Sequence, residues 1–137
     1  MNARAVSMNA RVLTVALVTF LLAQTSFAGD GDVTGLFSTF RLSEKSGDIS
    51  GAEIHIVPNP QGYSAIVQAS EGAPGLPEVV EVIAKGTTLV FTIPESSATG
   101  FPPGTYNGTV TKEGLKLHGP RGFYGDYFLP RKRSFWQ

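Results

Sequence analysis

The residues best suited to acid–base or metal chemistry gather around the first of two histidines. Glu53 and His55 flank Ile54, so in an extended strand their side chains point to one face. Glu44 and Asp48 lie in the turn-rich segment just before that strand. A zinc site needs three or four converging ligands, which one histidine beside one glutamate does not supply. We therefore interpret this face as an ordinary solvated strand surface.

The sequence lacks the usual signatures of enzymatic catalysis. It contains no Gly-x-Ser-x-Gly nucleophile elbow, no glycine-rich phosphate loop and no cysteine for thiol chemistry. Its 11 acidic residues offer no distinguishable pair for glycoside hydrolysis. His118 falls in a strand that would not neighbour the strand of His55 in a meander. We expect a binding protein rather than an enzyme, and we predict no catalytic residue, metal ligand or cofactor. A hydrolase that depends on His55 or His118 is the third hypothesis.

The C-terminal segment 131–137, Arg-Lys-Arg-Ser-Phe-Trp-Gln, combines cations and aromatic rings that are enriched in binding hot spots. One interpretation is therefore an anchor for a protein partner. The other is that the two rings fold back to cap one end of the domain, with an arginine stacked on a ring, because bare aromatic side chains favour aggregation. The candidate partner-binding residues are Arg131, Arg133, Phe135 and Trp136.

Four further aromatic side chains fall on the faces of their strands that alternation predicts to be interior. They either line a pocket for a small apolar ligand or fill the core, since a small β-barrel holds only side chains or one small ligand. Small residues at Ala52, Ala65 and Gly108 keep the pocket interpretation open. The candidate ligand-binding residues are Tyr63, Phe91, Tyr106 and Tyr127.

Short apolar runs with period-two alternation position these residues. All 16 glycines and all nine prolines follow residue 28 and separate the runs at fairly regular intervals, which is typical of an all-β domain. We count about eight candidate strands, each with one predicted inward face. The predicted inward residues are Leu36, Phe40, Leu42, Ala52, Ile54, Ile56, Tyr63, Ala65, Val67, Val80, Val82, Leu89, Phe91, Ile93, Tyr106, Val110, Leu115, Leu117, Tyr127 and Leu129.

The connections predict antiparallel hairpins. Lys85-Gly86 suits a two-residue turn, and Lys112-Glu113-Gly114 suits a three-residue hairpin with the glycine in the left-handed position. No glycine- and proline-free stretch between residues 35 and 130 has the 3.6-residue period of a crossover helix, which parallel pairing would need. We expect two longer loops, residues 71–77 and 94–104, at the mouth of the domain.

Sequential antiparallel strands of this number close into an up-and-down barrel, which removes exposed strand edges. The strand count and alternation, over most of the chain after residue 28, resemble the calycin architecture of lipocalin-like and avidin-like proteins. The resemblance implies the barrel alone, because the first strand reads Gly35-Leu36-Phe37 in place of the lipocalin Gly-x-Trp and the single tryptophan is Trp136. A β-sandwich is the alternative architecture.

The first 28 residues have the three-part layout of a secretory signal peptide. Arg4 and Arg11 precede an apolar segment, residues 12–23, of about a dozen residues, which is shorter than the roughly 18 that span a bilayer. Small residues up to Ala28 predict cleavage at that point and one domain of residues 29–137. Without a cysteine to carry a lipid, we expect no stable membrane anchor after cleavage.

The charge balance argues against a nucleic-acid partner. Without Arg4 and Arg11, nine basic residues face 11 acidic ones, a net charge of about −2, and the cations cluster only at the C-terminus. We expect a secreted or periplasmic non-enzymatic binding protein that holds a small apolar or amphipathic ligand in the barrel interior. The alternative is a protein-interaction or inhibitor module that uses the loops 71–77 and 94–104 or the C-terminal segment.

Overall fold

The computed structural model describes residues 32–120 and 126–136. The predicted signal peptide, residues 1–28, lies outside the described residues. Within the described ranges the chain forms strands and turns, and no helix there is long and apolar enough to cross a membrane.

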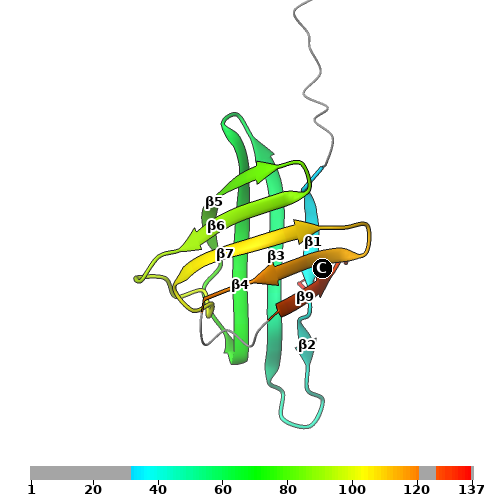
Figure 1. Cartoon of the computed structure of the whole chain (residues 1–137). Helices are drawn as coiled ribbons and strands as arrows, with labels where there is room; N and C mark the ends of the chain where they lie inside the picture. Colours follow the sequence, from blue (N-terminus) through cyan, green and yellow to red (C-terminus); the bar gives the residue numbers. More distant parts are fainter. Residues whose placement is uncertain (1–31, 121–125, 137) are drawn as a thin grey trace, which may run out of the picture.

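Nine strands follow one another along the described residues (Figure 1). They are rich in the β-branched and aromatic residues that pack well on a pleated surface. The two-residue strand β2 continues β1 in the same register on β3. The strands are β1 Gly35–Ser38, β2 Arg41–Leu42, β3 Ile49–Asn59, β4 Gly62–Pro74, β5 Glu78–Lys85, β6 Thr88–Ile93, β7 Gly104–Val110, β8 Gly114–His118 and β9 Asp126–Pro130.

The sheet is an up-and-down antiparallel meander in the order β1-β3-β4-β5-β6-β7-β8-β9, with β2 paired to β3. Phe37 of β1 bridges Arg131, which directly follows β9, and the Lys132 N–H donates to the Leu36 carbonyl at 3.0 Å. These contacts bring the first and last strands together, so the sheet curls into a nearly closed barrel (Figure 1). The predicted all-β meander of eight main strands is confirmed, and the barrel forms rather than the sandwich.

Inward-facing side chains of the main strands occupy the barrel interior. Phe91 and Tyr106 stack with ring centroids 5.2 Å apart, and Phe101 meets Tyr106 edge-on at 5.6 Å. From β3 to β9 the predicted inward residues are either buried or, for Tyr63 and Tyr127, partly buried and packed against the core. Alternation therefore located the interior of these strands correctly.

The first strand is the exception. Phe37 pairs with Ile54 of β3, and both are completely buried, so Phe37 faces the interior. Leu36, Phe40 and Leu42 consequently point outward, and the prediction that they face inward is wrong. Leu42 is 55% exposed, whereas Phe40 is buried beneath aromatic rings of the C-terminal segment. At Phe40, the apolar alternation thus marks an outer face that the C-terminal segment covers.

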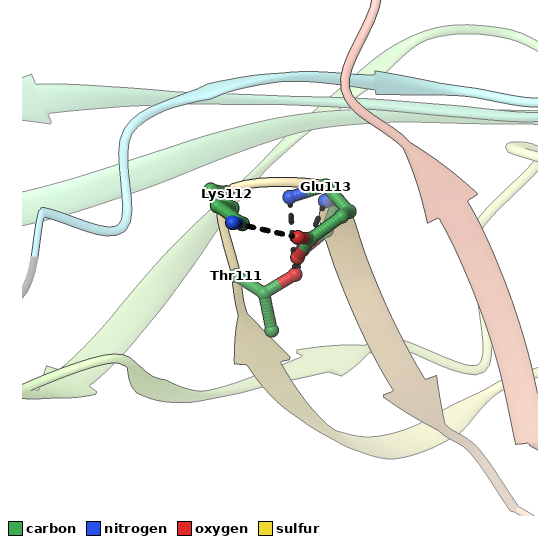
Figure 2. Close-up of polar contacts among 4 residues, drawn as sticks. Thr111, Lys112 and Glu113 are labelled. Carbon is green, nitrogen blue, oxygen red and sulfur yellow. Dashed lines mark hydrogen bonds and ion pairs between the residues drawn. The ribbon is translucent and has the colours of Figure 1, made fainter.

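Thr111 shapes the hairpin between β7 and β8 (Figure 2). Its Oγ1 accepts hydrogen bonds from the N–H groups of Glu113 and Gly114, each at 3.3 Å, and an ion pair joins Lys112 and Glu113 across 3.6 Å. The predicted left-handed glycine is wrong, because Gly114 is not among the described glycines with positive φ. A Cβ at this position would collide with the Leu129 carbonyl, so glycine is needed for close strand packing.

Candidate functional site

A pocket of about 650 Å³ opens at the end of the barrel where β1 passes into β2. Its walls come from the start of β3, the later part of β4 and the loop before β7, with one aromatic side chain from β9. A volume of this size is typical of sites for small organic ligands. The lining residues are Thr39, Arg41, Ser50, Gly51, Ala52, Ala69, Ser70, Glu71, Gly100, Pro102 and Tyr127.

The pocket is hollow because small residues meet at the mouth. Gly51, Ala52, Ala69 and Gly100 contribute little or no side-chain volume to its wall. Gly100 has φ +85°, and a Cβ there would lie 2.6 Å from the Ala69 carbonyl oxygen. Only glycine therefore allows the loop to approach β4 this closely while leaving the space beside it open.

The loop 94–104 is a fixed wall of this pocket. The Ala69 N–H donates to the Thr99 carbonyl at 2.6 Å, and the Leu76 N–H donates to the Ala98 carbonyl at 2.8 Å. Ser97 Oγ also donates to the Glu78 carboxylate at 2.8 Å, so both the backbone and the side chains hold the loop in place. The loop predicted at 71–77 is shorter than expected, because β4 continues to Pro74.

Hydroxyl groups and two charges provide the polar part of the pocket. Thr39 Oγ1 lies 3.3 Å from the Tyr127 hydroxyl and accepts a hydrogen bond from the Ala52 N–H at 3.0 Å. Arg41 Nε donates to Ser50 Oγ at 3.1 Å, which holds the guanidinium group at the rim. Glu71 also lies at the rim. The site therefore has a small apolar floor, and its rim carries hydroxyl groups, one positive charge and one negative charge.

The four predicted ligand-binding residues lie in three different places. Tyr127 lines the mouth pocket, whereas Tyr63 lines a separate depression of about 290 Å³ between the β3–β4 hairpin and β5. Phe91 and Tyr106 are buried and stacked on each other in the core. The Tyr106 hydroxyl donates to the carbonyl of Pro102 at 2.8 Å, so it supports the pocket wall from inside. Burial raises the pKa of Tyr106 to about 12.

The C-terminal segment folds back onto the outer face of β3. The two carboxylate oxygens of Glu53 accept hydrogen bonds from Ser134 Oγ at 2.8 Å and from the Phe135 N–H at 3.0 Å. The solvated surface predicted around Glu53 is therefore wrong for this residue, which is only 8% exposed. His55, two residues further along the same face, is partly buried.

Aromatic and cationic contacts complete this closure. The rings of Phe135 and Trp136 meet Phe40 edge-on, with centroid distances of 5.7 and 5.9 Å. Arg131 lies over the Phe37 ring at 4.8 Å and donates to the Thr34 carbonyl at 2.8 Å. The segment thus folds back, and an arginine stacks on a ring, but the two rings cover the barrel wall instead of capping its end.

The remaining partner-binding candidates are accessible. Arg133 is exposed, and 52% of the Trp136 surface is exposed despite its contact with Phe40. His118 lies on β8, where it lines a groove of about 640 Å³ on the outer face of β6 to β9. The structure confirms that the strands of His55 and His118 do not pair.

Fold and site together define an up-and-down β-barrel with a pocket at its mouth and a C-terminal segment closed over its wall. Comparisons with protein-family models, with curated proteins and with solved structures yield no match for this chain. The function is therefore inferred from the geometry of the barrel and its pocket.

Proposed function

We propose that this chain is an exported, non-enzymatic binding protein that takes a small amphipathic ligand at the mouth of its barrel. The observation that carries this proposal is the hollow between β3, β4 and the loop 94–104, where glycines and alanines stand in place of larger core side chains. The apolar signal-like N-terminal segment supports export to the periplasm or the medium.

The composition of the pocket wall indicates the ligand class. Ala52, Ala69 and Pro102 suit an apolar body, which gains free energy by leaving water. The guanidinium of Arg41 suits a carboxylate, sulfonate or phosphate, to which arginine binds through two parallel hydrogen bonds. An apolar molecule with one anionic end matches the apolar wall and Arg41, and a hydrogen-bond donor beside that end matches Glu71 at the same rim.

The test is a fluorescence titration with 8-anilinonaphthalene-1-sulfonate, which joins an apolar body to an anionic group. Ala69→Leu fills the pocket, and we expect it to weaken binding by about tenfold or more, because the added side chain excludes part of the probe. Arg41→Gln removes the cation and should weaken binding with the fold intact. The matched control is Ala73→Leu, which adds the same volume at an exposed position of β4.

Far-ultraviolet circular dichroism checks that each variant keeps its β-structure. Equal affinity of the wild type, Ala69→Leu and Arg41→Gln would overturn the proposed site. The same conclusion would follow if the folded wild type failed to bind the probe.

A second candidate function, a protein-interaction module, is favoured by a specific contact. Trp136 Nε1 donates to Gln68 Oε1 at 3.2 Å, and Gln68 Nε2 donates to the Gly75 carbonyl at 2.6 Å. One amide therefore joins the C-terminal segment to residues 75–77, where Leu76 is highly exposed. Exposed aromatic and aliphatic side chains are typical of interaction surfaces.

This candidate predicts that Trp136→Ala loses a protein partner while ligand binding at the mouth is unchanged. The measurement is a pull-down from a periplasmic extract with the wild type, Trp136→Ala and the control Val79→Ala, which removes an exposed side chain from the outer face of β5. A partner that all three proteins retain would exclude this surface.

A further inference from the structure

The outer face of β5 carries unusually exposed aliphatic side chains. Val80 and Val82 point into the core, so Val79 and Ile83 alternate with them and face solvent. Ile83 is 70% exposed and Val79 is 65% exposed. Residues 78–82 of β5 pair with β4 and residues 83–85 pair with β6, which fixes these two side chains on the outer face of the barrel.

Neighbouring strands extend this surface. The register places Val79 beside Ile66 of β4 and Ile83 beside Val90 of β6. Ile66 is also exposed, and Val90 is partly exposed. One aliphatic pair therefore spans β4 and β5, and the other spans β5 and β6. The exposed carboxylate of Glu81 lies between the two pairs on β5.

The charges on β5 are opposite in sign and equally spaced about Ile83. Glu81 and Lys85 lie two residues before and two residues after Ile83, and all three side chains are on the outer face. A twofold axis that lies in the interface, crosses β5 at right angles and passes Ile83 reverses the direction of the strand in the second copy. It therefore places Glu81 opposite the partner subunit's Lys85, and Lys85 opposite the partner subunit's Glu81.

We infer that the outer face of β5 binds a second copy of this chain in a symmetric dimer centred on Ile83. The depression beside Glu81, which Asn59, Gln61 and Tyr63 also line, gives the partner subunit's Lys85 room to reach the carboxylate. Face-to-face packing covers Ile83 and Val79 without breaking any ladder hydrogen bond.

The outer surface of a barrel is convex, which limits the contact area. We expect a contact below the roughly 800 Å² per partner of a standard stable complex, and therefore a weak dimer that forms as protein concentration rises. This inference is independent of the mouth pocket, because the residues involved line neither its floor nor its rim.

Sedimentation velocity of the purified protein over a concentration series tests the dimer. The wild type should shift from monomer toward twice the monomer mass as concentration rises. Glu81→Lys alone and Lys85→Glu alone each place like charges opposite one another, so each should weaken self-association by about tenfold. The combination of both substitutions restores opposite charges and should restore the dimer.

The matched control is Lys116→Glu, which makes the same charge change on the outer face of β8 and should leave self-association unchanged. A wild type that remains monomeric throughout the series overturns the inference. A dimer whose affinity neither single substitution changes also overturns the inference, since the contact then lies on another face. The same holds if the combined substitution fails to restore the dimer.

Discussion

Removal of the Ser134 hydroxyl probes how strongly the C-terminal segment is attached to the barrel. Ser134 Oγ donates to one carboxylate oxygen of Glu53 at 2.8 Å, and that glutamate is almost entirely covered. Hydrogen bonds to charged groups contribute about 1.5–3 kcal/mol to stability, and the partial exposure of Ser134 places the value at the lower end. We therefore expect Ser134→Ala to lower the free energy of unfolding by about 1.5 kcal/mol.

A double-mutant cycle isolates this interaction. Ser134→Ala and Glu53→Ala, alone and combined, should show a coupling of about 1–2 kcal/mol in urea denaturation. The only tryptophan of the chain is Trp136, so its fluorescence reports directly on the attached segment. The control Ser96→Ala removes an exposed hydroxyl from the loop 94–104 and should be neutral. A coupling near zero would refute the attachment through Glu53.

Two further predictions concern the hairpin and the core. Gly114→Ala drives a methyl group against the Leu129 carbonyl, so urea denaturation should show a loss of about 1–3 kcal/mol, and an unchanged midpoint would contradict the close packing. Because burial raises the pKa of Tyr106 to about 12, its contribution to stability is fully present below about pH 10 and is lost as pH rises toward 12. Tyr106→Phe should therefore flatten the decline of the urea midpoint over that pH range, and an equally steep decline would contradict this assignment.

Period-two alternation predicts most of the fold because each strand from β3 to β9 has one buried face. It fails in the segment that runs from β1 into β2 because that segment carries apolar residues on both faces, Phe37 inside and Phe40 outside. The reason lies in the C-terminal segment, which packs its rings on the outer face. Apolar residues on both faces of a strand indicate that a second element covers its outer face.

The candidate site was less predictable. Glu53 accepts hydrogen bonds from Ser134 and Phe135, which lie more than 80 residues further along the chain. No local sequence pattern predicts a contact between residues so far apart. Ala52 and Ala65 are alike in the sequence as small inward residues, yet only Ala52 lines the mouth pocket while Ala65 is packed in the core. Whether a small side chain leaves a hollow depends on its neighbours in space, which the sequence alone does not give.

The most direct test of ligand binding at the mouth is a map of amide chemical-shift changes on titration with 8-anilinonaphthalene-1-sulfonate. Binding at the mouth predicts saturable shifts centred on Ala52, Ala69 and Gly100. Shifts confined to the outer groove of β6 to β9, or no shifts at all, would contradict it.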